Sequence, residues 1–371
     1  YIHIPFCRQK CYYCDFYKTV NTSLTENFLS ALKSEIIQRK DYLEKETVET
    51  IYFGGGTPSV LTPVQTEDIL NVLAKEFSIS EIPEITFEAN PDDLSKIYLK
   101  EIRQTGINRL SIGIQSFQNE ILKKMNRRHD KGQAIEAIEL ASDTGFKNIS
   151  ADLIYGLPGL TIEQWKSNLS QIFQLPVQHL SAYHLTYHEG TAFYTWLKKG
   201  TLKELEEPES ILQFETLVEL AENFGFEQYE ISNFAMDKLY SKHNTSYWLG
   251  IPYLGLGPSA HSFNGLSRRW NISHVENYIS SIEKGNSYFE EEKLSENEKY
   301  NEFILTRIRT IWGISSIDLQ QRFGTEKRNY FQSIIEKYIK SGLATQENEI
   351  YRLTKKGLFI SDEIMANLMF I

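Results

Sequence analysis

The chain has 371 residues, 41% hydrophobic and 24% charged, a balance that allows one large domain and a smaller one and excludes wholesale disorder. Its formal net charge of −10 argues against broad, non-specific binding to nucleic acid. No apolar run approaches the roughly 20 residues that span a bilayer. The sequence also opens on an apparent strand rather than a secretory signal, so we expect a cytoplasmic protein.

Short runs of apolar, β-branched and aromatic residues alternate with amphipathic stretches along the first part of the chain. The predicted strands are residues 1–6, 48–53, 84–89, 108–114, 148–154 and 179–185. The predicted helices lie near residues 24–40, 63–77, 94–105, 132–144, 161–173 and 208–224. This alternation predicts βαβ units around a parallel sheet. We expect an α/β fold, a partial (β/α)6 TIM-like barrel over residues 1–225, with a doubly wound open sheet as the competing arrangement.

Two further segments follow the predicted barrel. Residues 226–290 are rich in Tyr, Gly, Asn and His, and we expect an irregular extension there. Residues 291–371 are expected to form a smaller winged-helix-like α+β domain, because helical patterns near 296–310, 315–322 and 326–341 precede a hairpin at 344–353 and a last helix near 355–368. Residues 301–371 hold ten Lys and Arg against eight Asp and Glu, which favours a cap or docking role over DNA binding.

All three cysteines of the chain lie in one short loop after the first predicted strand, as Cys7, Cys11 and Cys14. A disulfide scaffold would need an even and dispersed set. Three thiolates can hold three irons of a [4Fe–4S] cluster and leave the fourth open to a small ligand, whereas four cysteines would close the cluster. The alternative is a structural zinc site, but zinc-binding cysteine pairs usually recur further along a chain, and no second pair exists here.

Glycines and polar residues gather where the predicted strands end. Gly54, Gly55, Gly56 and Thr57 follow the second strand, and three glycines exceed the need of a simple strand-to-helix turn. Glycines let a backbone approach a ligand closely and expose its carbonyl groups. The spacing is neither that of a P-loop nor that of a dinucleotide-binding motif. Since chemistry in a (β/α) barrel lies at the carboxyl ends of the strands, we expect a binding site at this rim.

With its cysteine loop and the segment Tyr1–Cys7, the sequence resembles the radical S-adenosylmethionine (SAM) superfamily. Within it, the chain is similar along nearly its whole length to the branch of oxygen-independent coproporphyrinogen III oxidase and the heme chaperone HemW. The resemblance implies a [4Fe–4S] cluster and SAM, which chelates the open iron and on one-electron reduction yields a 5′-deoxyadenosyl radical. It also implies that four residues contact SAM or the adjoining substrate region: Glu88, Gln115, Arg127 and Asp152. For Arg127 the adjacent Arg128 is the alternative.

Two features separate the oxidase from the chaperone within this branch. The oxidase typically has another cysteine two residues after the third cluster cysteine, where this chain has Phe16. The segment His243–Trp248 matches the H-N-x-x-Y-W motif of the heme-binding relatives. A neutral imidazole is a normal axial ligand of heme iron, so His243 is the predicted heme-contacting residue. Without the motif, a histidine beside aromatic residues is more often a hydrogen-bonded core residue.

Three other histidines have weaker interpretations. His184 and His188 are four residues apart, but the glutamate of a helical zinc motif is absent and the segment is predicted to be a strand end, so a pocket wall is the better interpretation. Relatives often have Glu at the position of His188. His261 lies in a loop shared across the branch and is expected to shape the pocket.

These features predict a heme chaperone that binds heme, a [4Fe–4S] cluster and SAM and delivers heme to acceptor hemoproteins of the respiratory type. The alternative is an oxygen-independent coproporphyrinogen III oxidase of porphyrin biosynthesis. The expected partners are heme, the heme acceptors and an electron donor such as a flavodoxin or ferredoxin, with no nucleic acid and with a homodimer as a further expectation. The expected location is the cytoplasm, with a peripheral position at the membrane during heme delivery.

Overall fold

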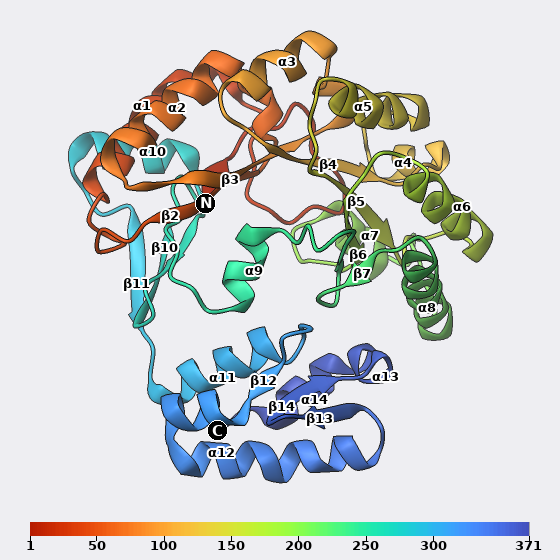
Figure 1. The fold of residues 1–371 in the computed structure, drawn as a ribbon. Coiled ribbons are helices and arrows are strands. Elements are labelled where there is room, and N and C mark those ends of the chain that lie inside the picture. Colours follow the sequence, from red (N-terminus) through yellow and green to blue (C-terminus); the bar gives the residue numbers. More distant parts are fainter. Residues whose placement is uncertain (371) are drawn as a thin grey trace.

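A curved sheet of mostly parallel strands forms the larger part of the structure, a computed structural model that describes residues 1–370 (Figure 1). Its first six strands pair in chain order, each parallel to the next. They are β1 (Ile2–Ile4), β2 (Val48–Gly55), β3 (Ile79–Ala89), β4 (Arg109–Gln115), β5 (Ile149–Tyr155) and β6 (His179–His184). The sequential order confirms the partial barrel, because a doubly wound sheet would reverse its strand order partway.

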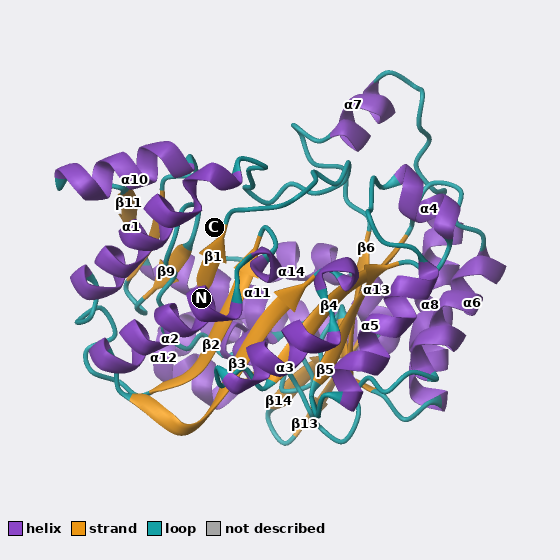
Figure 2. Cartoon of the chain, turned by 90° about the horizontal axis from the view of Figure 1, so that it is seen from above, coloured by secondary structure: helices purple, strands orange, loops and turns teal. Residues whose placement is uncertain are grey.

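Helices cover the outer face of this sheet (Figures 1 and 2). Six of them match the predicted helices: α1 (Thr25–Gln38), α2 (Pro63–Glu76), α3 (Lys96–Gln104), α5 (Lys131–Asp143), α6 (Ile162–Phe173) and α8 (Glu207–Asn223). Capping boxes begin α2 at Thr62, α5 at Asp130 and α6 at Thr161. The prediction missed short elements: α4 (Asn119–Lys124), α7 (Ala192–Lys198) and the 3-10 turns Thr22–Leu24, Pro58–Val60 and Pro91–Asp93.

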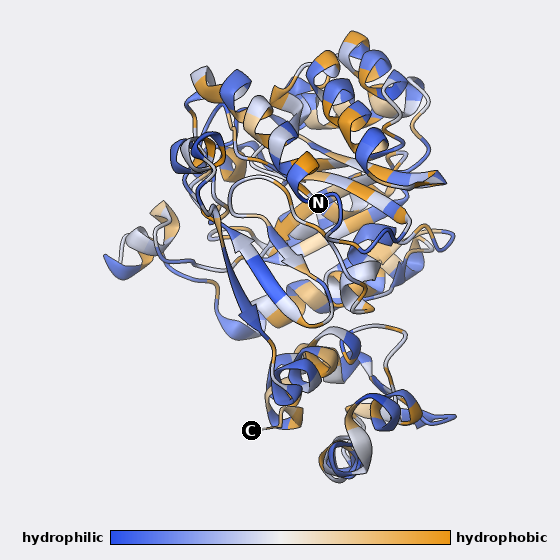
Figure 3. Cartoon of the chain, turned by 90° about the vertical axis from the view of Figure 1, so that its left-hand side faces the viewer, coloured by the Kyte–Doolittle hydropathy of each residue, from blue (hydrophilic) through white to orange (hydrophobic). Residues whose placement is uncertain are grey.

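Hydrophobic and hydrophilic residues both occur along the strands (Figure 3), because the face that the helices cover is apolar whereas the inward face carries polar side chains. Phe53, Phe87, Leu110 and Ile149 are fully buried between the sheet and the helices. The inward face is polar along much of its length, for example at Arg109 and Ser111 on β4, and Glu88 and Asp152 stand nearer the carboxyl ends of β3 and β5. The core therefore fixes the rim on which the predicted site residues stand.

The extension over residues 226–290 is more regular than the sequence suggested. It contains β7 (Glu227–Gln228), β8 (Asn233–Ala235), α9 (Lys242–Trp248), β9 (His261–Phe263), β10 (Ser267–Asn271) and α10 (Val275–Lys284), and β11 (Phe289–Lys293) follows. β8 pairs antiparallel with β6, whereas residues 254–257 run beside β1 through backbone hydrogen bonds such as His3 N to Leu256 O at 2.8 Å. The extension therefore covers both edges of the six-stranded sheet.

A buried carboxylate fastens this extension to the barrel. Glu35 on α1 is fully buried and accepts hydrogen bonds from Gly257 N at 2.7 Å, Asn271 Nδ2 at 2.7 Å and Tyr278 Oη at 2.6 Å. Arg39, one helical turn further on, lies 3.7 Å from the same carboxylate. Burial raises the pKa of Glu35, while the hydrogen-bond donors and Arg39 oppose that rise.

Replacing Glu35 with alanine is expected to lower the free energy of unfolding by about 3–5 kcal/mol, because it leaves Arg39 and several donors buried without their acceptor. Urea denaturation followed by circular dichroism measures this loss. The matched control is Glu26→Ala on the exposed face of the same helix, which should change the free energy of unfolding by less than about 1 kcal/mol. Equal effects of the two substitutions would contradict the anchoring role of Glu35.

The C-terminal residues form a separate α+β module below the barrel in Figure 1, as predicted. Its elements are α11 (Glu296–Arg307), β12 (Ile314–Ser315), α12 (Ser316–Lys340), β13 (Ala344–Glu347), β14 (Ile350–Leu353), α13 (Lys355–Phe359) and α14 (Ser361–Leu368). Gly324 interrupts α12 with non-helical backbone angles, which accounts for the two helices that the sequence predicted there. The module has its own hydrophobic core, distinct from that of the barrel.

None of the helices formed by residues 1–370 is long and apolar enough to cross a membrane.

Candidate functional site

The cysteine loop leaves β1 at the carboxyl rim of the sheet and is held there by backbone and side-chain hydrogen bonds. Tyr12 N donates to Met125 O at 3.1 Å, and Asn126 Nδ2 donates to Lys10 O at 2.8 Å. From the other side, Phe193 N on α7 donates to Tyr12 O at 3.0 Å, and α7 lies beyond the strand ends in Figure 2. The loop is therefore fixed between the helix after β4 and the helix after β6.

A cavity of about 430 Å³ opens beside this loop, inside the barrel rim. We call it the cluster cavity. Its lining brings together most of the residues that the sequence singled out: Cys7, Cys11, Cys14, Gly55, Gly56, Thr57, Glu88, Gln115, Arg127 and Asp152. Gly54 and His243 do not line it. The carboxyl ends of five strands thus converge on the three thiols.

The donor set suits an iron–sulfur cluster. Burial raises the pKa of the Cys7 thiol to about 11 and also raises that of Cys14, so both stay protonated until a metal supplies positive charge. No three His, Cys, Asp or Glu side chains among residues 1–370 converge in the way that a single metal ion needs. A cubane cluster binds each thiolate through a different iron, so its cysteines surround a volume rather than a point. The chemistry of the three thiols therefore fits a [4Fe–4S] cluster better than zinc.

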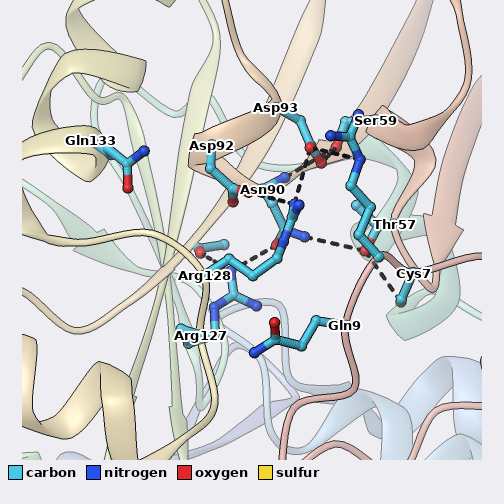
Figure 4. Close-up of polar contacts among 12 residues, drawn as sticks. Cys7, Gln9, Thr57, Ser59, Asn90, Asp92, Asp93, Arg127, Arg128 and Gln133 are labelled. Carbon is cyan, nitrogen blue, oxygen red and sulfur yellow. Dashed lines mark hydrogen bonds and ion pairs between the residues drawn. The ribbon is translucent and has the colours of Figure 1, made fainter. Parts of the chain in front are cut away.

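A chain of polar contacts connects Cys11 to Cys7 across the cavity wall, and Figure 4 shows its part from Arg127 through Asn90 and Thr57 to Cys7. Arg127 Nη1 lies 3.5 Å from Cys11 Sγ, and Arg127 Nη2 donates to Asn90 Oδ1 at 2.7 Å and to Gly113 O at 2.6 Å. Asn90 Nδ2 donates to Thr57 Oγ1 at 3.3 Å, which lies 3.3 Å from Cys7 Sγ. Arg127 therefore places a positive charge beside the thiols, where a cluster with its thiolates carries negative charge.

Arg128 points away from the cluster cavity. Its guanidinium pairs with Asp92 at 2.5 Å and with Asp93 at 3.0 Å, behind the turn that follows β3 (Figure 4). The two adjacent arginines thus have different surroundings, and Arg127 is the one that lines the cavity.

Gln115 sits at a distortion of the sheet. The register between β4 and β5 shifts between Gly113 and Gln115, and Gln115 has a positive φ of 65°. A non-glycine residue in this region at a bulge is typical of functional sites, where the bulge redirects a side chain. A Cβ at Gly113 would come within 2.9 Å of Gln115 Nε2 and 3.4 Å of Arg127 Nη2, so glycine at this position lets the two side chains approach each other.

The glycines after β2 are needed for packing against β1. A Cβ at Gly55 would lie 2.5 Å from the His3 imidazole, and one at Gly56 would lie 2.7 Å from Ile4 O. Gly56 N and Thr57 N donate to the carbonyl oxygens of β1 and its following residues, at 2.8 Å each. The glycine run therefore brings β2 close enough to support the cysteine loop, in addition to lining the cavity at Gly55 and Gly56.

Two buried carboxyl groups face the cavity from neighbouring strands. Burial raises the pKa of Glu88 to about 7, although Tyr52 Oη donates to it at 2.6 Å. Burial raises the pKa of Asp152 to about 6, and Ser111 Oγ donates to it at 3.1 Å. Both groups gain from a nearby positive charge, which the sulfonium of SAM would supply.

We expect SAM affinity to fall about tenfold between pH 8 and pH 6, because a carboxyl of pKa about 7 is mostly ionised at the first pH and mostly protonated at the second. Without SAM, Glu88 has the opposite effect on the free energy of unfolding. Between about pH 4.5 and pH 7 its carboxyl is protonated in the folded protein and ionised in the unfolded chain, so the free energy of unfolding decreases as the pH rises through this range. Isothermal titration calorimetry between pH 6 and pH 8 measures the SAM affinity of the wild type and of Glu88→Gln. Retention of the full pH dependence in Glu88→Gln would exclude Glu88 as its source.

His243 is placed differently from the sequence-based expectation. It lies on α9, is only 4% exposed, and both ring nitrogens have partners: Nδ1 is 2.8 Å from Thr50 Oγ1 and Nε2 is 2.8 Å from Tyr247 Oη. Its ring stacks on Tyr52 at 4.9 Å, and burial holds its pKa well below the usual range. In this arrangement the imidazole has no free nitrogen for iron and instead joins α9 to β2.

His184 and His188 do not form a metal pair. His184 Nε2 lies 3.1 Å from Ser210 Oγ on α8, whereas His188 Nδ1 lies 3.4 Å from Asp15 Oδ2 in the cysteine loop. Both line the cluster cavity, which agrees with a pocket wall.

A larger cavity, of about 870 Å³, lies between the barrel and the C-terminal module. We call it the interdomain cavity. Phe16 lines both this cavity and the cluster cavity, and its side chain is 64% exposed. Phe16, which occupies the position where the oxidase pattern has another cysteine, thus borders both cavities.

Residues 1–172 match the radical SAM superfamily, and residues 294–360 match the HemN C-terminal domain. The heme chaperone HemW of Bacillus subtilis (strain 168) is 34% identical over 369 residues, which cover 99% of this chain and 97% of that protein. The chain belongs to the HemW-like family of the radical SAM superfamily. The heme chaperone HemW of Lactococcus lactis subsp. lactis (strain IL1403) is 31% identical to this HemW-like chain, over 100% of this chain and 96% of its own length.

A solved structure shares the fold of this HemW-like chain. The coproporphyrinogen III oxidase HemN from Escherichia coli superposes with a TM-score of 0.85 and 23% identity, covering 99% of this chain and 89% of its own. The likeness includes the C-terminal module, so the arrangement of both parts recurs in that protein.

Several further residues of the cluster cavity received no role from the sequence. Tyr52, Arg109 and Ser111 line it, as do Asn90 and Gly113, which belong to the polar and glycine residues at the strand ends. Arg109 is 2% exposed, and its Nε has no hydrogen-bond partner among the described residues. Alternation along the strand could have identified Arg109 and Ser111, because residues two apart on β4 point to the same face of the sheet as Gly113 and Gln115.

Proposed function

We propose that this HemW-like chain is a heme chaperone: it binds heme, a [4Fe–4S] cluster and SAM, and it delivers heme to acceptor hemoproteins. The observation that carries the proposal is the interdomain cavity, which is about 870 Å³ and meets the cluster cavity at Phe16. Pockets of roughly 300–1,000 Å³ bury most of a cofactor-sized ligand. The names of the full-length relatives support the same function.

The chain's own residues divide the binding tasks in this proposal. Cys7, Cys11 and Cys14 hold the cluster, and Arg127 offsets its negative charge. Glu88 and Asp152 face the sulfonium and ribose of SAM from adjacent strands. When bound, the cluster and SAM supply one-electron chemistry to the rim of the barrel.

The alternative function is that of an oxygen-independent coproporphyrinogen III oxidase. Phe16 disfavours it, because the corresponding cysteine of the oxidase pattern is absent. The fold alone does not separate the two functions, since the E. coli oxidase has the same architecture.

The partners in this proposal are respiratory-type hemoproteins as heme acceptors and a flavodoxin or ferredoxin as electron donor. The cysteine loop lies at the barrel rim, where a small redox protein can approach it. The proposed place of action is the cytoplasm, with contact at the membrane surface during heme delivery. The chain acts as a monomer or as a homodimer in this proposal.

The test is anaerobic reconstitution of the cluster followed by two parallel assays. The first titrates hemin into the protein, follows the Soret band and then adds an apo-hemoprotein acceptor. The second incubates the protein with coproporphyrinogen III, SAM and a reductant and measures decarboxylated product. We expect a stable heme complex, transfer to the acceptor and no decarboxylation. Decarboxylation without a heme complex would reject the chaperone function.

A further inference from the structure

The interdomain cavity is large enough for a porphyrin, at about 870 Å³, and many of its lining residues are aromatic. Its walls come from the start of the barrel, from the extension and from α11 and α12. Aromatic side chains dominate its lining: Tyr1, Phe16, Tyr17, Tyr247, Trp248, Tyr253, Phe263, Phe303 and Phe323. Flat aromatic surface suits a large planar ligand, and polar groups at the margin would orient that ligand.

Two histidines line this cavity, and they differ in availability. The ring of His3 is 3% exposed, and its nitrogens lie 3.1 Å from Tyr1 Oη and 3.0 Å from Tyr17 O. His261 on β9 is exposed, and no hydrogen bond or ion pair to its side chain is found within residues 1–370. Together with the two partners of His243, this leaves His261 as the imidazole at the cavity that can bind iron without breaking a hydrogen bond.

The backbone of His261 is firmly placed although its ring is free. It pairs with Trp270 across β9 and β10, and the two rings stack with centroids 6.3 Å apart. Gly255 packs so closely on it that a Cβ there would lie 2.0 Å from His261 O. Burial and the nearby Arg268 lower the pKa of His261, which keeps its imidazole neutral, the form that ligates iron.

Several basic residues also line the interdomain cavity and could bind carboxylates. Arg268, Arg322 and Lys299 each pair with a glutamate or aspartate. Arg307 has no acidic partner within ion-pair distance among the described residues, and its Nη2 donates only to Leu249 O at 2.9 Å. A half-buried arginine without a counter-ion at an aromatic cavity suits a propionate, because a guanidinium can donate two parallel hydrogen bonds to a carboxylate.

We infer that heme occupies the interdomain cavity, with His261 as a protein ligand of its iron and with Arg307 binding a propionate. This inference rests on the proposed heme-binding function and deepens it. It moves the iron ligand from α9 to β9 and leaves His243 as a buried residue that positions α9 beside the cavity. Because Phe16 borders both cavities, heme in this place would lie next to the cluster cavity.

The first experiment titrates hemin into the full chain carrying its cluster and records difference spectra against the same protein without hemin. We expect His261→Ala to shift or abolish the Soret band of the complex and to weaken hemin binding about tenfold or more. Added imidazole should restore the wild-type spectrum, which a folding defect would not allow. His274→Ala is the matched control, since His274 is an exposed histidine outside the cavity and should leave the spectrum unchanged.

The second experiment compares hemin with its dimethyl ester, in which the propionates carry no charge. Arg307→Ala should weaken hemin binding about tenfold and leave binding of the ester unchanged. Arg328→Ala is the control, because Arg328 bonds to Gln320 and Glu349 away from the cavity. Equal losses for hemin and ester would overturn the assignment of Arg307.

The outcomes separate this inference from the proposed function. If the wild type forms no heme complex, the proposed function fails. If the wild type binds heme and His261→Ala keeps the same Soret band and affinity, the function stands and the His261 assignment is wrong. Loss of the Soret band in His243→Ala with no change in His261→Ala would place the ligand on α9 instead.

Discussion

Replacing Cys11 with alanine is expected to abolish the broad iron–sulfur absorption of the reconstituted protein and to reduce its bound iron almost to zero. A cubane held by three cysteines has no spare protein ligand, so loss of one thiolate leaves two irons open. Cys7, Cys11 and Cys14 are the three cysteines of the chain, so no other thiolate can take the place of Cys11. Absorption spectra after anaerobic reconstitution and chemical iron analysis measure the effect.

Lys10→Ala provides the control for disturbing the cysteine loop without removing a thiol. Lys10 is an exposed residue next to Cys11, so its substitution should leave the absorption and the iron content unchanged. Circular dichroism should show the same folded content in both variants before reconstitution. Full absorption in Cys11→Ala would refute the cluster assignment for this cysteine.

The barrel was predictable from the sequence because its signals are local. The strand over residues 148–154 was expected from its run of apolar residues, and the structure has β5 at Ile149–Tyr155. The cysteine spacing and the polar residues at strand ends then placed the cluster cavity, since parallel strands deliver their carboxyl ends to one rim. Glu88 and Asp152, 64 residues apart in the chain, meet there for this reason.

The extension was not predictable in the same way, because tertiary pairing decides its structure. The residues of β8 and the segment 254–257 are too short to give a strand pattern, and they are extended because β6 and β1 offer them unpaired edges. His243 shows the same limit for single residues. Its motif indicated heme contact, but hydrogen bonds to Thr50 and Tyr247 occupy both ring nitrogens. Thr50 is far away in the sequence, and the motif does not reveal that the Tyr247 hydroxyl bonds to the imidazole.

The adjacent pair Arg127 and Arg128 shows what only the structure decides. In the sequence the two arginines are adjacent, and either one can be assigned to the site. In the structure a left-handed residue, Asn126 with a φ of 60°, precedes them, and their guanidinium groups reach different partners. Arg127 reaches the thiols and Asn90, whereas Arg128 pairs with two aspartates (Figure 4).

Arg127→Met is therefore expected to lower the free energy of unfolding by about 3 kcal/mol and to weaken SAM binding at least about tenfold, because two charge-assisted hydrogen bonds to Asn90 and Gly113 disappear. Arg128→Met should lower the free energy of unfolding by about 3 kcal/mol, because the largely buried Asp92 loses its ion pair, but it should spare SAM binding, since Arg128 does not line the cluster cavity. Urea denaturation and SAM titration of the cluster-bound protein compare the two variants. If Arg128→Met weakens SAM binding as much as Arg127→Met, the guanidinium of Arg127 has no special role at the cluster cavity, and the contact with Cys11 does not contribute to SAM binding.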